Sequence, residues 1–393
     1  MSTPHVNTPI YLDNHATTRC ADEVIDAMLP YLRTHFGNAA SRGHSFGYRA
    51  RAATEKARAQ IAEWIGATPR EIVFTSGATE SNNIALLGTA RRLAERGRHI
   101  ITVATEHKAV LDPLSALARE GFEVTVLPVD GEGLIDVDDV RRALRDDTVL
   151  VSVMAINNEI GVAQPIGDIG ALCRDREIVF HSDAAQTTYS PLNVRDEAID
   201  LLSLSAHKLY GPKGVGALYV RSGRPRVNPW PLQHGGGHER GLRSGTLPVP
   251  LVVGFGAAVT LLANEQEAAV PRIKALRDRM LVDLQKGCDG IRVNGSMRHR
   301  APHNLSLTID RVTAEDVLLG MRDVACSTGS ACTSETLEPS HVLQALGHPE
   351  DARQATVRLG LGRYTTTEEV DYAIARLIET VHNLRGSHDK SAV

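Results

Sequence analysis

The sequence predicts an α/β fold in which a mainly parallel, seven-stranded sheet lies between helices and a smaller α+β unit follows. Short runs rich in apolar and β-branched residues alternate with segments of helical period over residues 71–220. These runs are apolar almost throughout, which indicates strands that are buried on both faces of a sheet. A chain of 393 residues also has ample material for a large core and for more than one domain.

Seven runs are predicted, in chain order, to be the strands of the large sheet: residues 71–75 ("EIVFT"), 99–105 ("HIITVAT"), 124–129, 148–156, 177–182, 200–205 and 215–220. Helical segments ending near residue 94 and spanning 109–120 separate the first three runs. Alternation of strand and helix favours parallel strands with helices over both faces of the sheet.

The pattern changes after residue 250. A long helical stretch over 250–287 leads to the short runs "IRVNG" and "HNLSLTI" and then to a tail rich in helix. Its most apolar part, Leu251 to Ala263, is well short of the roughly 20 residues that a membrane span requires, so a buried helix is expected. We predict a large domain at 17–260 and a small domain formed by 1–16 and 261–393.

The composition argues against several classes of function. The formal net charge is -4 and no basic run stands out, which gives no support for a nucleic-acid or membrane-surface role. The first residues lack the basic start and apolar stretch of a secretory signal. His234 and His238 are four apart, but the three glycines between them make a helical metal site unlikely, and no metal is expected. The five cysteines are scattered, without a CxxC pair, which argues against a disulfide framework or a zinc site and favours a reducing, cytoplasmic location: Cys20, Cys173, Cys288, Cys326 and Cys332.

Polar side chains follow five of the predicted strands. Ligands of open α/β sheets bind beyond the carboxyl ends of the strands, so these side chains are expected at one edge. They comprise a possible anion cradle, an imidazole, an amide, a carboxylate and a lysine, in the segments Ser76–Thr79, Glu106–His107, Asn157–Asn158, Asp183–Gln186 and His207–Lys208.

Each of these residues also has an ordinary structural explanation. The segment Ser76–Thr79 could be a plain helix N-cap, Asp183 a cap or an ion-pair partner, His107 a packed histidine and Lys208 a solvated lysine. Together they match a site for pyridoxal phosphate: a glycine turn and helix start for the phosphate, a carboxylate for the ring nitrogen, a flat ring to stack on it and a lysine that forms a Schiff base.

Longer motifs identify a family. The segments "FTSGATESNN", "TEHKAVLD", "INNEIGVAQPI", "HSDAAQ", "SAHKLYGPKG", "GGGHERGLRSGT" and "STGSACTSETLEPSHVLQALG" resemble the cysteine desulfurases of the NifS/IscS type, which belong to the fold-type I, class V aminotransferase group. The likeness runs in order from "YLDNHATT" to "VRLGLGRYT". Three positions depart from the family pattern. Thr328 stands where a serine is expected, His15 where a small residue, Asn or Ser, is expected, and Ala39 where proline is common. His15 and Ala39 leave the fine substrate preference open.

The resemblance implies a role for each site residue. Lys208 would bind the cofactor covalently, His107 would stack on its ring and shuttle protons, and Arg358 would bind the substrate carboxylate. Thr246 would reach the phosphate of the neighbouring subunit, which implies a homodimer. The remaining cofactor contacts would come from Ala78, Thr79, Ser205 and His207 at the phosphate, Asp183 at the ring nitrogen, Gln186 at the phenolic oxygen, and Asn158, which would contact the cofactor or the substrate.

Cys332 is the second expected nucleophile. Its surroundings, "CSTGSACTSETLEPS", are small and polar, so an exposed loop over about residues 326–336 is predicted. The alternative, a buried apolar filler, fits poorly with so few apolar neighbours. Cys326 lies six positions upstream, close enough for a sulfur relay or a regulatory disulfide with Cys332, and we hold that as a hypothesis.

The resemblance thus implies a pyridoxal phosphate-dependent cysteine desulfurase that converts L-cysteine to L-alanine. A persulfide on Cys332 would supply iron–sulfur cluster assembly, through a scaffold protein, or tRNA thiolation, through another acceptor protein. A selenocysteine lyase or another class V transferase is the enzyme alternative. A non-catalytic assembly protein that only binds scaffold partners is the alternative from another class, although intact Lys208, Asp183, His107 and Cys332 argue against it.

Overall fold

A computed structural model describes residues 6–223, 227–328 and 340–391 of the chain. All seven predicted strands form one sheet in the order β2-β8-β7-β6-β5-β3-β4, in which β8 runs antiparallel to both of its neighbours and the others share one direction. The α/β class is therefore confirmed. The strands are β2 (Ile72–Thr75), β3 (His99–Val103), β4 (Glu123–Leu127), β5 (Thr148–Ser152), β6 (Val179–Asp183), β7 (Leu201–Ser205) and β8 (Gly216–Val220).

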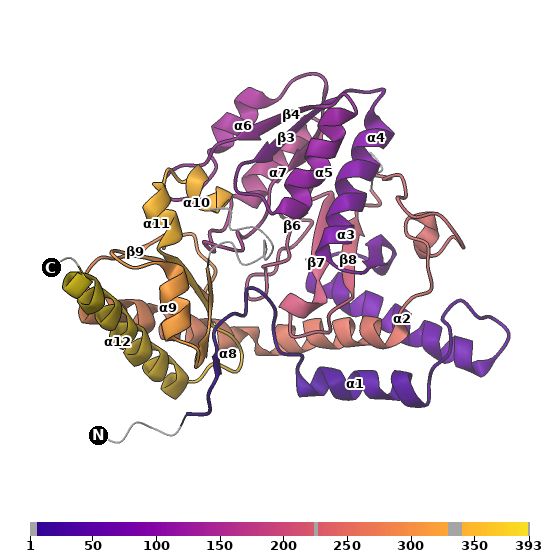
Figure 1. Ribbon diagram of the computed structural model, residues 1–393. Coiled ribbons are helices and arrows are strands. Elements are labelled where there is room, and N and C mark those ends of the chain that lie inside the picture. Colours follow the sequence, from indigo (N-terminus) through magenta and orange to yellow (C-terminus); the bar gives the residue numbers. More distant parts are fainter. Residues whose placement is uncertain (1–5, 224–226, 329–339, 392–393) are drawn as a thin grey trace.

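Helices cover both faces of the large sheet (Figure 1). Successive side chains of a strand point to opposite faces. Leu150 therefore packs into the core beneath α5, whereas Val151 packs into the larger core on the other face. The face that Leu150 enters carries α3 (Ala78–Asn83), a π-helical turn (Ile84–Gly88), α4 (Thr89–Leu93) and α5 (Lys108–Arg119). The remaining helices of the unit built on the large sheet are α1 (Asp22–Arg33), α2 (Ser45–Trp64), α6 (Val137–Ala143) and α7 (Ile166–Asp175).

The long helix α8 (Val249–Gly287) packs against α1 and α2 and then continues toward the smaller sheet (Figure 1). Length and apolar composition alone would allow it to cross a membrane. Its residues Val252, Phe255 and Val259 are instead fully buried in the largest core, as expected for a core helix. The predicted domain boundary at residue 260 falls inside α8, and the boundaries remain a prediction.

The second unit is a four-stranded antiparallel sheet in the order β12-β13-β10-β9. Figure 1 shows it beside α8, α9 and α12. A separate two-stranded parallel pair joins β1 to β11. The elements are β1 (Ile10–Tyr11), β9 (Ile291–Val293), β10 (Asn304–Ile309), α9 (Ala314–Gly320), β11 (Val324–Ala325), β12 (Ser327–Thr328), α10 (His341–Ala345), α11 (Glu350–Gln354), β13 (Thr356–Gly360) and α12 (Thr367–Ser391).

A buried ion pair fixes the glycine-rich segment before α8 to the large sheet. Arg58 of α2 donates from Nη1 and Nη2 to the two carboxylate oxygens of Glu239, each at 2.8 Å. Glu239 also accepts the backbone N–H of Phe74 in β2 at 2.7 Å. Because both side chains are at most 5% exposed, neither charge has water as an alternative partner. The pair therefore anchors the segment that leads to Thr246 against the strand that precedes the Ser76–Thr79 turn.

Replacing Glu239→Gln leaves the buried Arg58 charge with only the largely exposed Glu55 carboxylate as a counter-charge. We expect the free energy of unfolding to fall by about 3–5 kcal/mol, the range for breaking a buried pair, measured from the midpoint and slope of urea unfolding. Asp22→Asn is the control, because it removes the exposed Arg19–Asp22 pair and should cost less than about 1 kcal/mol. Equal effects of the two variants would contradict the anchoring role.

Candidate active site

The structure brings the predicted residues to one edge of the large sheet. Strands β3, β5, β6 and β7 are parallel, and β2 shares their direction, so all five end at the same edge. This arrangement places beside one another the segments that the sequence analysis selected after these strands. The site lies where open α/β sheets bind ligands.

Lys208 lies at the end of a 3₁₀ turn, Ala206–Lys208, that follows β7 directly. Its Nζ donates to the carbonyl oxygen of Ala16 at 2.7 Å and also to that of His15. The carbonyl of Lys208 accepts from Thr188 Oγ1 at 2.8 Å. The short turn and these contacts hold the lysine backbone while its amine stays at the sheet edge.

His207 is held by the N-terminal segment. Its Nδ1 lies 3.1 Å from Thr17 Oγ1, and its carbonyl accepts from Thr18 Oγ1 at 2.9 Å. Burial, then the neighbouring Lys208 and Lys213, lowers the pKa of His207 to about 4. A neutral imidazole that accepts at one nitrogen donates from the other, so His207 can donate a hydrogen bond to a phosphate without competing as a base.

Asp183 ends β6 and is 4% exposed. Its Oδ2 accepts from Asn82 Nδ2 at 2.6 Å, and its Oδ1 accepts from the backbone N–H of Ala185 at 2.9 Å. Among the residues that the structure describes, no ion pair joins Asp183 to a cation. A buried carboxylate without a counter-charge is stabilised when a cation binds beside it, and a protonated pyridine nitrogen is such a cation.

The turn between β2 and α3 is shaped to take an anion. A Cβ built on Gly77 would meet no atom within 4 Å, so open space lies beside the turn. Gly216 of β8 packs so closely under it that a Cβ there would lie 2.6 Å from Gly77 Cα. Ala78 and Thr79 begin α3, which runs on through the π turn and α4 in the region predicted to be helical up to residue 94. First-turn N–H groups and the Thr79 hydroxyl suit a phosphate.

Gln186 lies within the site and is 4% exposed. Its Nε2 donates to the His15 carbonyl at 3.0 Å, and its Oε1 lies 3.0 Å from His15 Nδ1. His15 was noted in the sequence only as a departure from the family pattern, and the structure places it in direct contact with a cofactor-binding candidate. Ala39, the other departure, lies in the loop between α1 and α2, where its carbonyl accepts from Arg51.

Arg358 lies in β13 and reaches the site from the small sheet. It donates from Nη1 to the carbonyl of Asn158 at 2.8 Å and from Nη2 to Asp13 Oδ1 at 2.9 Å. These bonds use two of the five N–H groups of a guanidinium. Its Nε is buried without a hydrogen-bond partner among the described residues. The side chain therefore retains donors for a carboxylate next to Asn158.

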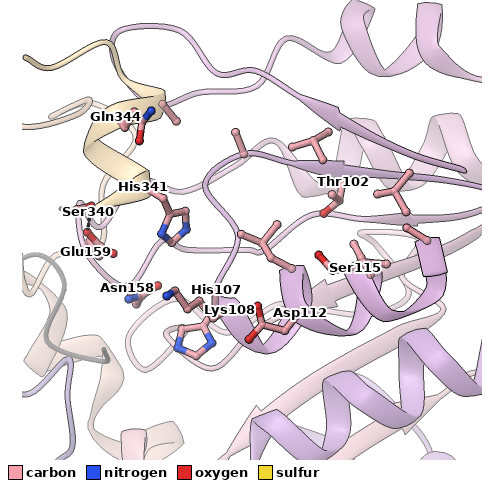
Figure 2. Close-up of a pocket in the computed structure, with 17 residues that line it drawn as sticks. Thr102, His107, Lys108, Asp112, Ser115, Asn158, Glu159, Ser340, His341 and Gln344 are labelled. Atoms are coloured by element: carbon pink, nitrogen blue, oxygen red, sulfur yellow. Dashed lines mark hydrogen bonds between the residues drawn. The ribbon is translucent and has the colours of Figure 1, made fainter. Parts of the chain in front are cut away.

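His107 is the N-cap of α5, and its Nδ1 accepts the backbone N–H of Ala109 at 3.0 Å. The neutral ring therefore carries its proton on Nε2. His107 and Asn158 border a cavity of about 670 Å³ between α5 and α10. Figure 2 shows this cavity with Ser340 and Glu159 in contact at its edge, where Ser340 Oγ donates to Glu159 Oε2 at 2.5 Å. Burial raises the pKa of Glu159 to about 7.

Sequence reasoning missed two residues that support Asp183. Asn82 lies one helical turn after Ala78, so its spacing from the predicted phosphate-binding turn could have indicated that its side chain faces the site. Glu106 precedes His107 and is completely buried, with Oε1 accepting the Met154 N–H at 2.5 Å. Burial, reinforced by the nearby Asp183, raises the pKa of Glu106 well above its usual value. This environment favours the neutral form of Glu106.

Three further predicted residues, Cys332, Thr246 and Cys326, have different outcomes. Cys332 lies outside the described residues. Thr246 is exposed, three residues after Arg243, whose Nε contacts Glu80 of α3 at 2.9 Å. Cys326 lies between β11 and β12, where burial raises the pKa of its thiol to about 12. Sulfur chemistry requires a thiolate, so this environment disfavours the relay hypothesis for Cys326.

The residues present fit pyridoxal phosphate. Asp183 offers a buried negative charge to a ring nitrogen, and the Gly77 turn offers space and N–H donors to a phosphate. Lys208 offers a primary amine at the same edge, and His107, at the N-terminus of α5, offers an imidazole. Ser205, the last residue of β7, is buried beside the lysine turn.

Comparisons with known proteins agree with this reading. The family model described as "Aminotransferase class-V" matches residues 10–373. The cysteine desulfurase of Homo sapiens is 52% identical over 378 residues, which cover 96% of this chain and 82% of the human protein. The "Cysteine desulfurase IscS" of Anaeromyxobacter sp. (strain Fw109-5) is also 52% identical, over 96% of this chain and 93% of that protein.

Solved structures show the same fold. One titled "NIFS-LIKE PROTEIN" superposes with a TM-score of 0.88 at 37% identity, covering 95% of this chain and 99% of that one. Another, titled "SspA in complex with cysteine", gives a TM-score of 0.79 at 38% identity, covering 91% and 100%. This chain therefore belongs to the class-V aminotransferase family and, within it, to the cysteine desulfurases of the NifS/IscS type.

Proposed function

We propose that this chain converts L-cysteine to L-alanine with pyridoxal 5′-phosphate as cofactor and carries the released sulfur as a persulfide on Cys332. The observation that best supports the proposal is the buried Asp183 carboxylate, which has no cationic partner among the described residues and shares one sheet edge with Lys208. Bound pyridoxal phosphate acts as an electron sink for the substrate carbanion.

Eight residues would bind and orient the cofactor and the substrate. Ala78, Thr79, Ser205 and His207 would hold the phosphate, Asp183 would keep the ring nitrogen protonated, and Gln186 would donate to the phenolic oxygen. Asn158 and Arg358 would orient the substrate, because the guanidinium of Arg358 offers a planar set of donors to the carboxylate. The Arg358–Asn158 contact already brings these two residues together.

Two residues move protons. The ε-amine of Lys208 would accept the α-proton of the substrate at Nζ and return a proton during product formation. His107, with its proton on Nε2, is the second carrier. Both groups lie at the sheet edge. A group that transfers a proton must lie within hydrogen-bond distance of it, or be connected to it through one water molecule.

Cys332 is the nucleophile. Its thiolate attacks the sulfur of the substrate, so that an S–S bond forms while the substrate C–S bond breaks, and the electron pair of that bond stays with the carbon skeleton that becomes alanine. The product on the enzyme is a persulfide. Covalent capture divides a difficult C–S cleavage into two easier steps.

The protein would work as a cytoplasmic homodimer. Thr246 is exposed and would complete the phosphate site of the neighbouring subunit. The persulfide would pass to an iron–sulfur scaffold or to a sulfur-acceptor protein for tRNA thiolation. No direct contact with nucleic acid or membrane is proposed.

Cys332→Ala separates the nucleophile from the cofactor site. We expect the variant to remain yellow, because no cofactor contact is changed, and to release neither sulfide nor alanine from L-cysteine with a reductant. Wild type should release both in equal amounts. The control is Cys20→Ala, which should keep full activity. Continued desulfuration by Cys332→Ala would refute its role and favour a lyase that acts without a protein thiol.

Asp183→Asn tests the charge at the ring nitrogen. A hydrogen bond to a charged group is worth about 1.5–3 kcal/mol, so cofactor affinity and sulfide production should each fall by roughly 10- to 100-fold. Both are measurable, by absorbance on cofactor titration and by sulfide release. Asp26→Asn is the matched control, because Asp26 is exposed on α1, away from this sheet edge, and should change neither quantity. Unaltered affinity in Asp183→Asn would contradict the assignment.

Hybrid dimers test Thr246. Lys208→Ala and Thr246→Ala subunits, carrying different affinity tags, are combined and the hybrid is isolated. If Thr246 acts on the neighbouring subunit, one site of the hybrid has both defects and the other is intact, so half of the wild-type activity should return at limiting cofactor. If Thr246 acts within its own subunit, each site of the hybrid has one defect, no intact site forms and the activity does not return.

A further inference from the structure

A chain of buried hydrogen bonds leads from the small sheet to Gln186. It runs from Arg300 to Asn304, from Asn304 to His15 and from His15 to Gln186, with contact distances of 2.6, 3.1 and 3.0 Å. Asn304 and His15 are fully buried. Each link fixes which atom of the next residue donates, so the chain has one direction.

The direction begins at Arg300, which can only donate. Its Nε donates to the carbonyl of Ser296 and its Nη2 to that of Gly295, each at 3.0 Å, which fixes the guanidinium. Its Nη1 donates to Asn304 Oδ1. The carbonyl oxygen of the Asn304 amide therefore faces Arg300, and the NH₂ group faces the other way.

Both hydrogens of that NH₂ group have acceptors. Asn304 Nδ2 lies 3.2 Å from the carbonyl of Glu159 and 3.1 Å from His15 Nε2. His15 Nε2 must therefore accept, and the neutral ring carries its proton on Nδ1. That proton is donated to Gln186 Oε1.

Gln186 is then held at both ends of its amide. Oε1 accepts from His15 Nδ1, and Nε2 donates one hydrogen to the His15 carbonyl. The reverse orientation would place the amide NH₂ against an N–H donor and the amide oxygen against a carbonyl. One hydrogen of Nε2 is left for a further acceptor.

We propose that His15 is a positioning residue that locks the Gln186 amide with its NH₂ group available to the phenolic oxygen of the cofactor. The inference rests on the proposed function of this site. It assigns to His15, acting through Gln186 and without touching the substrate, the control of how strongly that oxygen is stabilised as a phenolate.

The surroundings of His15 keep it neutral, as this role requires. Burial, and then the neighbouring His303 and Arg358, lowers the pKa of His15 well below its usual value, and Lys208 acts in the same direction. The ring stacks on His303 with centroids 4.3 Å apart and planes 25° from parallel. A protonated His15 would place an N–H donor against the Asn304 NH₂ group, which the packing disfavours.

The test is an absorbance titration of the bound cofactor from neutral to alkaline pH. Loss of a donor to a phenolate destabilises the deprotonated chromophore, so His15→Ala should raise the pKa of the chromophore by about one unit. Gln186→Ala should raise it similarly. The double variant should shift it no further than Gln186→Ala alone, because His15 acts through Gln186.

Two variants of similar size separate positioning from packing. In His15→Asn, the side-chain Nδ2 stands at the same place along the chain as His Nδ1, so it can donate to Gln186 Oε1 and should restore the wild-type titration. In His15→Asp, a carboxylate faces Gln186 Oε1 and turns the amide, so the shift should be at least that of His15→Ala. This pair also decides the question if His15→Ala fails to fold.

Equal titrations in wild type, His15→Asn and His15→Asp would overturn the inference while leaving the proposed function intact, because the cofactor would still be bound. Additive shifts in the double variant would also overturn it. A wild-type protein that binds no cofactor would overturn the proposed function and this inference together.

Discussion

The segment at residues 10–18 is the constraint on which the site depends, because it is shared by both sheets. Ile10 pairs with Val324 in the β1–β11 ladder, and the backbone of Leu12 bonds to Ala325 and Gly360. A few residues later in the same segment, the carbonyl oxygen of Ala16 accepts a hydrogen bond from the Lys208 amine. The lysine turn of the large sheet and the Arg358 strand of the small sheet are thus held by one short stretch of chain. A shift of this segment would move Lys208 relative to Arg358, the two residues proposed to bind the cofactor and the substrate carboxylate.

Burial changes the pKa values of the ionisable side chains at this edge of the sheet. Burial beside Asp183 raises the pKa of Glu106 well above its usual value, and His207 is neutral because burial and two lysines lower its pKa to about 4. Asp183 keeps two N–H donors, which stabilise its ionised form. Arg358 already pairs with Asp13, whereas Asp183 has no ion-pair partner among the described residues. A preorganised charged group acts more strongly on a ligand in a buried, low-dielectric site than it would in water.

Much of this site follows from the sequence, and the missing parts share one cause. Strand periodicity and strand ends predicted the seven-stranded sheet and the segment that holds each candidate, including Lys208 and Asp183. His15, Asn82 and Glu106 were not given roles, because their importance comes from contacts between segments far apart in the chain. His15 meets Asn304 across 289 positions. Neither local propensity nor spacing encodes the His15–Asn304 contact, whereas a strand end can be predicted from a few consecutive residues.

Among the cysteines that the structure describes, three have environments that disfavour a thiolate. Cys173 and Cys288 are buried, and the thiol pKa of Cys326 is raised to about 12. The segment that carries Cys332 leaves β12 at Thr328, which pairs with Val357, the neighbour of Arg358. Four residues of chain extend to at most about 14 Å, which limits how far residue 332 can lie from Thr328. We propose that a tether of this length delivers the Cys332 thiol to a substrate held by Arg358.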